Sequence, residues 1–485
     1  MALLTPLEGS AGAVKSLCII YVIRTLSLLL LAFSATFLFP SFSPLGYDTS
    51  STHITGDTTD PLTTGFVERL VTALTRWDAI YFASIARHGH RWEQEWAFGV
   101  GQSYLVHGVQ WILGLLGADG MSPSFQILFL SIVSCGSHLV SAIILYHLTA
   151  LLFNPAGPKG TLGNSGETPN VVAFIAATLH ILSPAGIFLI APYNESIFSV
   201  LSFLGYWFYS YAVKNTAPDG EHGAVNEVFL LLSGLAFGVS GLFRSNGIIN
   251  GVLFVFEVSQ SALRVLSGIN PVANIRLFII SGVAGALVGL PMVWRQYLGW
   301  VEYCSLVEPA MQRDWCAKRL PSIYSFVQSH YWGVGFLKYW TPNNIPLFLL
   351  ASPTLYVLFK TSAKIISIQP PELPTLYSLD LKHANKDLLF RLTLPQLLLA
   401  VMAVTSYHVQ IIARLSSGLP MWYIVSAAGL VQTGGRPKDS AKSKDGEAGE
   451  DLKSEEAGWV RPAVKFFLGY QVVQAVLYGG FLPPA

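Results

Sequence analysis

Long apolar runs recur along the whole chain and limit the folds that it can adopt. About 20 apolar residues cross a bilayer as a helix. The first such run covers 17–39, and because it lacks the small-residue cleavage site of a removable signal peptide, we predict a retained membrane anchor. Further apolar runs follow at 97–117, 124–153, 170–191, 195–213, 227–256, 274–294, 334–359, 390–412, 419–433 and 463–483.

Two of these runs leave the number of membrane spans open. The run 97–117 carries Gln102, His107 and Gln110, which suits a helix at the interface or along a cavity as well as a span. The run 227–256 is long enough for two helices joined at a break. We therefore predict an all-α polytopic membrane protein with about eight to eleven transmembrane helices, forming a single multispan domain over 1–485.

The low charge of the chain supports this class of protein. Charged residues make up 12% of the sequence and hydrophobic residues 52%, against about 25% charged residues in an ordinary soluble domain. A soluble globule of this composition would expose large apolar patches, and the 13% aromatic content excludes intrinsic disorder. The net charge of +1 gives no field that would attract nucleic acid.

The loops carry a weak topology signal. Lysine and arginine favour cytoplasmic loops, which assigns the basic segment 360–391 to the cytosol and places 295–333 in the lumen. The polar segment 40–96 then forms the first lumenal loop, which we predict to be structured. The charged stretch 434–461, rich in glycine and serine, is expected to be a flexible cytosolic insert.

The densest set of ionisable residues follows the first apolar run. Arg76, Trp77, Asp78 and Tyr81 lie in a segment with helical spacing, where Asp78 and Tyr81 would share one face. Trp77 suits the membrane–water boundary, and a carboxylate there is placed to act as a general base towards a sugar hydroxyl. The alternative is an aspartate that is ion-paired with Arg76 at a helix end.

A second acidic pair, Glu93 and Glu95, lies in the same loop. Two carboxylates at alternating positions resemble metal or acid–base ligands, but adjacent solvated acids are commoner. No His/Asp spacing in the sequence supports a metal cage. We therefore predict no metal site.

Polar residues also interrupt the apolar runs further along. Ser183–Gly186 and Ala191–Ser196 break one region twice, and irregular backbone at membrane depth is tolerated where it lines a wet cavity. Asn194 and Glu195 are therefore candidate cavity residues, although Asn194-Glu195-Ser196 also matches a glycosylation sequon that we expect to be unused so close to the bilayer.

Two arginines within apolar surroundings are candidate phosphate ligands. Arg244 with Asn246, and Arg414 with Gln410, suit binding of a phosphate group. The alternative for each arginine is a side chain that snorkels to the lipid headgroups. We expect His408, near the second pair, to be structural. Cys304 and Cys316 would pair if their loop faces an oxidising lumen, and from spacing alone two free thiols are equally open.

These residues lie in segments that together resemble a known family. The sequence resembles the membrane glycosyltransferases of GT-C type that add the second mannose in glycosylphosphatidylinositol (GPI) anchor synthesis. The matching segments keep their order along most of the chain: RWDAIYFASIARHGHRWEQEWAF (76–98), SPAGIFLIAPYNESIFSVLSFLG (183–205), GLFRSNG (241–247), Trp315-Cys316, IYSFVQSHYWGVGFLKYW (323–340) and the proline-bounded stretch Pro346–Pro353.

The resemblance implies a multi-pass enzyme of the endoplasmic reticulum membrane with its active site in the lumen. Its donor would be dolichyl phosphate mannose, a substrate and not a cofactor, and its acceptor the GPI precursor that already carries one mannose. The new bond would be α-1,6, formed with inversion and without a metal. The resemblance also implies that Asp78 is catalytic, that a small accessory membrane subunit is a partner, and that Cys304 and Cys316 form a lumenal disulfide.

Two other functions remain alternatives at this point. Another dolichyl-phosphate-sugar transferase would share the same features. A multispan lipid transporter or scramblase also needs buried polar groups, but it is expected to carry them in the middle of its spans. In this chain the acidic residues instead cluster in one predicted loop.

Overall fold

The computed structural model describes residues 9–38, 65–118, 120–153, 167–217, 220–308, 311–367, 386–434 and 458–482. Most of the charged insert 434–461, and the part of the first loop before residue 65, therefore lie outside the described residues. Within the described residues the chain is built from helices and irregular connections. This confirms the predicted all-α class.

In the described part of the chain, eight helical segments are long and apolar enough to cross a membrane, which agrees with the predicted range of spans. They are α1 (Gly9–Leu38), α6 (Pro123–Phe153), α8 (Glu195–Lys214), α9 (Ala224–Phe243), α10 (Val252–Leu266) with the turn before it, α11 (Pro271–Trp300) with the turn after it, α13 (Ile345–Ser367) with the turn before it, and α14 (Lys386–Ser406). Three further helices pack among them: α7 (Glu167–Ile181), α16 (Met421–Gly434) and α18 (Val460–Gly479).

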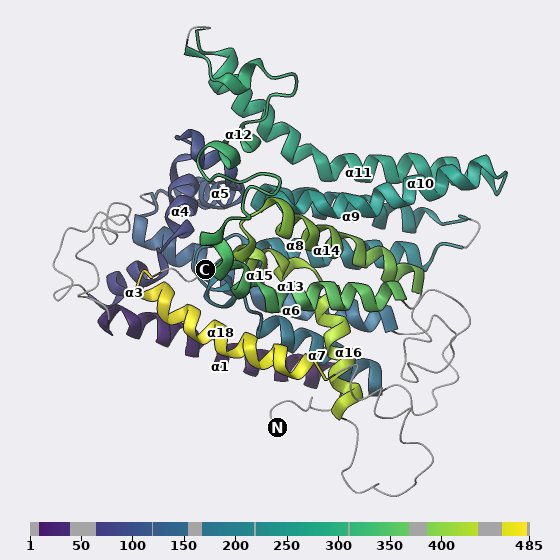
Figure 1. The fold of residues 1–485 in the computed structure, drawn as a ribbon, viewed down its shortest axis with the longest axis horizontal. Helices are drawn as coiled ribbons and strands as arrows, with labels where there is room; N and C mark the ends of the chain where they lie inside the picture. Colours follow the sequence, from purple (N-terminus) through teal and green to yellow (C-terminus); the bar gives the residue numbers. More distant parts are fainter. Residues whose placement is uncertain are drawn as a thin grey trace, which may run out of the picture.

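The long helices lie side by side along the long axis of the molecule (Figure 1). The first and last of them, α1 and α18, are direct neighbours although they lie at opposite ends of the sequence. Their backbones meet at Gly479, where a Cβ atom would lie 2.1 Å from the carbonyl oxygen of Ala32. Only glycine fits at such a close backbone contact. Gly479 therefore allows α18 to pack directly against α1.

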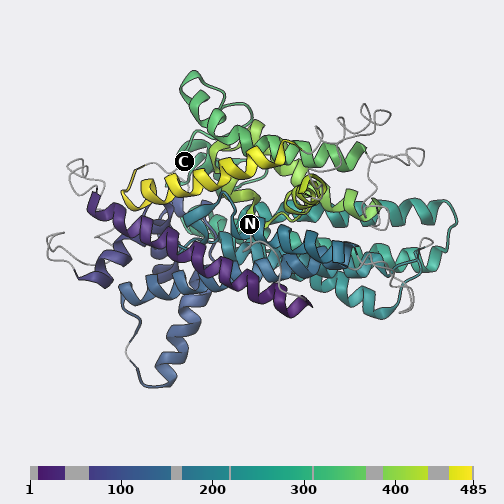
Figure 2. The ribbon, with the colours of Figure 1, turned by 90° about the horizontal axis from the view of Figure 1, so that it is seen from below.

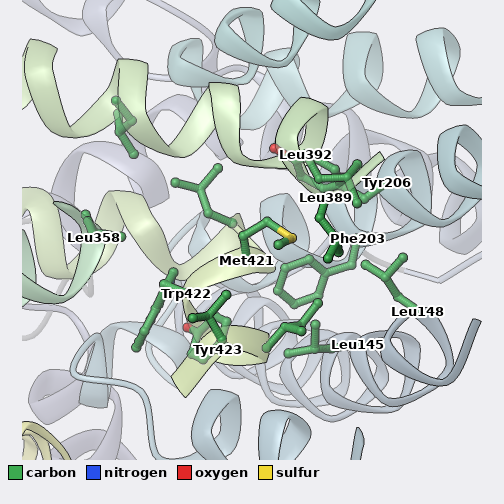
Figure 3. Packing of buried hydrophobic residues seen from close by; sticks show 14 of the residues in the cluster. Leu145, Leu148, Phe203, Tyr206, Leu358, Leu389, Leu392, Met421, Trp422 and Tyr423 are labelled. Atoms are coloured by element: carbon green, nitrogen blue, oxygen red, sulfur yellow. The ribbon is translucent and has the colours of Figure 1, made fainter. Parts of the chain in front are cut away.

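A large apolar core fills the centre of this bundle. Figure 3 shows side chains from different helices meeting there, among them Phe203, Leu389, Leu392 and Met421. Trp422 and Tyr423 at the start of α16 are buried in the same core, and their rings stack at 3.7 Å. Packing of apolar side chains at close range fixes how the helices sit against one another.

Several connections gather at one end of the bundle, which we call the α4 end. The first of them contains α3 (Phe66–Leu74), α4 (Asp78–His88), η3 (Glu93–Ala97) and α5 (Gly101–Leu115). The others contain η5 (Gly186–Leu189), η6 (Ser245–Gly251), η7 (Val301–Ser305), η9 (Asp314–Ala317), α12 (Ile323–His330), η10 (Pro342–Asn344), η11 (Val409–Ile411), α15 (Ile412–Leu415) and η12 (Ser416–Gly418). Ion pairs between these connections, described below, bring them together.

The structure refines three of the sequence predictions. The helical segment that contains Asp78 is two helices, α3 and α4, separated by a break at 75–77. The apolar run 227–256 is indeed two helices, α9 and α10, joined by η6. The run 97–117 forms α5, which lies crosswise to the long helices in Figure 2 and does not span the bundle.

Candidate active site

A cavity of about 270 Å³ opens at the α4 end, between the connections of the helices. Its lining comes from segments that are far apart in the sequence. The lining residues are Asp78, Tyr81, Phe82, Ala97, Phe98, Gly99, Phe243, Arg244, Ser245, Asn246, Tyr324, Gln328, Trp332, Tyr407, His408, Ile411, Arg414 and Leu415. Polar and charged side chains from four connections thus face one space, which is the arrangement expected of a binding or catalytic site.

Asp78 is presented to this cavity by a break in the backbone. It is the first residue of α4, and the preceding Trp77 has φ 54°, in the left-handed region that side chains other than glycine rarely adopt. Such a conformation costs about 1–3 kcal/mol and persists only where the surroundings hold it in place. The start of a helix also favours a carboxylate electrostatically, since the backbone N–H groups there carry partial positive charge.

Two tyrosines hold this break in place. Tyr478 on α18 donates its hydroxyl hydrogen to the carbonyl oxygen of Leu74 (2.8 Å) and accepts from the N–H of Arg76 (3.4 Å). Tyr193 donates to the carbonyl oxygen of Arg76 (3.1 Å). The polar backbone groups before Trp77 are therefore paired with buried side chains, which compensates for the missing helical hydrogen bonds.

A chain of ion pairs connects Asp78 to the other cavity residues. Arg414 contacts the Asp78 carboxylate through Nη1 (2.9 Å) and the Glu195 carboxylate through Nε (2.8 Å). Arg244 contacts the same Glu195 oxygen through Nη1 (2.6 Å). Glu195 is fully buried, so one carboxylate positions two arginines at the cavity wall.

Arg414 is the more tightly held of the two arginines. Besides its two carboxylate partners, its guanidinium lies over the rings of Phe188 (4.4 Å) and Tyr193 (4.9 Å). Burial alone would lower the pKa of Arg414, but the carboxylates of Glu195 and Asp78 outweigh it and raise that pKa. Arg414 is therefore a permanent cation that orients Asp78.

Arg244 has fewer side-chain contacts than Arg414 and a slightly larger exposed fraction. Within the described part of the chain its single ion pair is the one to Glu195, and its side chain keeps 13% of its surface exposed. Next to it, Asn246 carries a buried Oδ1 that has no hydrogen-bond partner among the described residues. Arg244 thus offers N–H donors to an anionic group such as a phosphate, while the Asn246 Oδ1 offers an acceptor to a hydroxyl group of a ligand.

Aromatic side chains form the facing wall. Tyr81 stacks on Phe98 at 4.9 Å, and Phe98 meets Trp332 edge-on at 5.4 Å. His408 lies against Tyr339 and contacts the carbonyl oxygen of Trp332 through Nε2 (3.3 Å). Burial lowers the pKa of His408, which keeps its ring neutral near pH 7.

Some of these wall residues are absent from the sequence-based site prediction. Tyr324, Gln328, Trp332 and Tyr407 were not predicted, because no spacing rule connects them to Asp78. The available signal for Tyr324, Gln328 and Trp332 was their place in the family-matching segment 323–340, and for Tyr407 its place beside His408. Tyr324 accepts a hydrogen bond from Ser245 (3.1 Å), which ties α12 to the arginine segment.

The two predicted acidic residues, Glu93 and Glu95, do not line the cavity, and their hydrogen-bond and ion-pair partners given below do not line it either. Glu93 accepts from Trp315 Nε1 (3.2 Å) and Tyr331 Oη (2.9 Å) and pairs with Arg313 (3.2 Å). Glu95 accepts from the backbone N–H groups of Arg91 (2.7 Å) and Trp92 (3.0 Å). Both carboxylates are buried and hydrogen-bonded, as expected of groups that stabilise the fold of the loop.

The remaining predicted residues surround the cavity without lining it. Trp77 donates through Nε1 to the carbonyl oxygen of Leu482 (3.2 Å), and the guanidinium of Arg76 lies over the ring of Phe481 (5.0 Å). Asn194 is fully buried and donates to the carbonyl oxygen of Phe243 (3.0 Å), so the sequon is inaccessible in the folded chain. Gln410 accepts from the Tyr339 hydroxyl (3.1 Å).

Cys304 and Cys316 form a disulfide, with their Cα atoms 5.5 Å apart. The bond closes the segment between η7 and η9 beside a cluster that contains Trp96, Trp315 and Ile323. Among the residues that the structure describes, no group of three or more His, Cys, Asp or Glu side chains is placed to hold a metal ion.

Helices long and apolar enough to span a membrane, with a charged cavity at one end of their bundle, define a multispan membrane protein that carries a candidate binding or catalytic site. Comparison with known proteins identifies the family. Residues 15–485 match the family model described as Mannosyltransferase (PIG-V), and the chain belongs to this family. It is therefore a multi-pass membrane glycosyltransferase, as the resemblance implied.

Fungal relatives match over most of their length. A protein of Gibberella zeae is 37% identical over 86% of this chain and 86% of its own length. A protein of Aspergillus fumigatus is 35% identical over 100% of this chain and 99% of its own. One of Yarrowia lipolytica is 31% identical over 91% and 93%, respectively. All three are named GPI mannosyltransferase 2.

Among solved structures, the chain is similar to the Archaeoglobus fulgidus oligosaccharyltransferase in its apo form. That match has 13% sequence identity and a TM-score of 0.39, and it covers 94% of this chain. The chain spans 56% of the length of that oligosaccharyltransferase.

Proposed function

We propose that this mannosyltransferase transfers the second mannose, in α-1,6 linkage, from dolichyl phosphate mannose to the GPI precursor that carries one mannose. The proposal rests on the family and on the names of its relatives for the sugar and the pathway. It rests on the cavity for the chemistry. The proposed location is the endoplasmic reticulum membrane with the α4 end in the lumen, and the accessory subunit stays a prediction.

The observation that carries the proposed chemistry is the juxtaposition of one carboxylate and two arginines around a single cavity. In the proposed reaction the acceptor hydroxyl oxygen attacks C1 of the donor mannose from the face opposite the phosphate. Its proton passes to the Asp78 carboxylate, and the C1–O bond breaks with its electron pair on the phosphate oxygen. Attack opposite the leaving group inverts the configuration at C1, and a positioned base contributes roughly 10²–10⁴-fold in rate.

The two arginines take different roles in this proposal. Arg414 is held by two carboxylates and two aromatic rings, so it orients the Asp78 carboxylate. Arg244, which pairs with Glu195 and keeps part of its side chain exposed, binds the donor phosphate and stabilises the charge that develops on it. Asn246 lies beside Arg244 at the cavity and supplies a further polar contact.

Lipid analysis of cells depleted of the protein tests this function. Mannose-labelled cells should accumulate a GPI precursor with one mannose, which the wild-type chain clears and Asp78→Asn does not. Asp314→Asn is the matched control, because Asp314 is exposed in the disulfide-closed segment and does not line the cavity. Normal intermediates in depleted cells would contradict the reaction, and clearance by Asp78→Asn would remove Asp78 from the mechanism.

A further inference from the structure

Helix α5 leaves the bundle at the edge of the cavity. Its first turns are buried against the protein: Val106 packs with Ala86 of α4 and Leu130 of α6. From residue 107 onwards most of its side chains are exposed. Figure 2 shows α5 projecting from the body of the molecule, across the direction of α1. It therefore lies closer to the plane of the membrane than to the direction of the spans.

The exposed side of α5 is an apolar stripe. The stripe consists of Tyr104, Trp111, Ile112, Leu115 and Leu116, whose exposed fractions lie between 51% and 75%. Their spacing of three, four and seven residues places them on one face of a helix. No Asp, Glu, Lys or Arg occurs between Ala97 and Ala118.

The most direct occupant for this stripe is lipid. The spans α6 and α11 carry exposed apolar side chains of the same kind, such as Ile132 (70%) and Leu290 (59%), as expected of helices in contact with lipid. The stripe on α5 lies at the end of these spans, where Trp and Tyr side chains favour the membrane–water interface. An apolar face on a helix that lies along the membrane plane is typical of helices embedded in one leaflet.

The base of α5 is rigidly joined to the cavity. A Cβ atom on Gly99 would lie 2.0 Å from the carbonyl oxygen of Phe243, and one on Gly101 would lie 2.6 Å from the Phe243 ring. The backbone before α5 therefore touches the residue that precedes Arg244. Arg295 adds hydrogen bonds from the end of α11 to the carbonyl oxygens of Trp96 (2.9 Å) and Phe98.

We propose that α5 is an in-plane membrane helix, and that its apolar stripe inserts into the leaflet at the α4 end and holds Arg244 at the depth of the lipid phosphates. The membrane seating stands on the exposed stripe and its orientation. The link to phosphate depth rests on the proposed function, in which Arg244 binds the phosphate of a lipid-linked donor.

Spin labels on the full-length protein in phosphatidylcholine nanodiscs test the seating. Labels at Trp111→Cys and Leu115→Cys, in a Cys18→Ala/Cys135→Ala background, should be accessible to oxygen and protected from a water-soluble nickel chelate. Ile132→Cys serves as the lipid-facing control and Lys318→Cys, on an exposed polar segment, as the water-facing one. Preferential access of the nickel chelate would overturn the proposal, and so would low access to both reagents, which would indicate a protein covering α5.

Enzyme kinetics test the link to the cavity. Leu115→Lys/Leu116→Lys should raise the KM for a long-chain polyprenyl phosphate mannose several-fold and leave turnover of a short-chain, water-soluble donor unchanged. Leu320→Lys, an equally exposed residue outside α5, should change neither value. Equal loss with both donors, or no change with either, would overturn the link to phosphate depth. If the wild-type chain transferred no mannose, the proposed function would fail while the spin-label result would still decide the seating.

Discussion

The hydroxyl group of Tyr478 lies 2.8 Å from the carbonyl oxygen of Leu74, which is 404 positions earlier in the chain. Through this contact the last helix of the described chain holds the backbone break that presents Asp78. The same hydroxyl accepts from the N–H of Arg76, and Trp77 reaches the carbonyl oxygen of Leu482. The C-terminal helix is thus part of the support of the active site, although it contributes no cavity-lining residue among those described.

Removing that hydroxyl should impair catalysis more than substrate binding. Tyr478→Phe loses both hydrogen bonds and leaves buried backbone groups unpaired, so we expect kcat to fall by about 10-fold, equivalent to ~1.4 kcal/mol, with the donor KM nearly unchanged. Tyr356, which is half exposed on α13, provides the control: Tyr356→Phe should leave kcat and the donor KM unchanged. An unchanged kcat for Tyr478→Phe would show that the break is held by other contacts.

Glu195 should be essential for stability as well as activity. Glu195→Gln removes a carboxylate that both Arg414 and Arg244 contact, and breaking a buried pair from one side costs about 3–5 kcal/mol. We expect a clearly lower melting temperature in detergent. Asp387→Asn breaks a pair whose acidic side chain is 50% exposed, and it should cost at most about 1 kcal/mol. Equal melting temperatures for the two variants would contradict the role of Glu195.

The two cavity arginines should separate kinetically. Arg244→Gln is expected to raise the KM for the lipid-linked donor by roughly 10-fold or more, since a charge-assisted hydrogen bond is worth about 1.5–3 kcal/mol. Arg414→Gln should instead lower kcat, because Asp78 loses its orienting partner. Steady-state kinetics with purified enzyme measure both values. If the two variants had the same effects, the assignment of separate roles would be wrong.

The loop that carries the site should lose stability in acid. His90 stacks on Trp96 at 4.6 Å, and burial together with the charge of Arg295 lowers the pKa of His90 to about 4. The unfolded chain takes up this proton near pH 6.5 and the folded chain does so only near pH 4. Its contribution to stability is therefore complete above pH 6.5 and is lost as the pH falls towards 4, by at most about 1.4 kcal/mol per pH unit.

Melting temperatures between pH 7 and pH 4.5 measure this dependence. The wild-type chain should melt at a lower temperature at pH 4.5 than at pH 7, and His90→Gln should flatten the decline. A variant with the same slope as the wild type would assign the acid sensitivity to other groups.

The amino-acid sequence by itself determined the class of protein and most of its spans. Apolar runs of about 20 residues allow little else than a membrane helix, since each helix satisfies its own backbone hydrogen bonds within the bilayer. The sequence also identified Asp78, Glu195, Arg244 and Arg414 as candidates. Charged residues beside or within apolar runs are energetically unfavourable, so they usually mark functional sites. The family resemblance added the sugar-transfer chemistry, which no spacing could show.

Only the tertiary structure decided how these residues are combined. For Asp78 the sequence left open a general base or an ion pair with Arg76. Among the described residues its ion pair is instead with Arg414, more than 300 positions away, because the connections after α14 and before α8 meet at the α4 end. Glu93 and Glu95 follow a pattern like that of a functional pair, but their hydrogen bonds hold the loop together. Sequence spacing describes neighbours on one helix, whereas long-range ion pairs depend on how helices pack, and packing is set by the whole bundle at once.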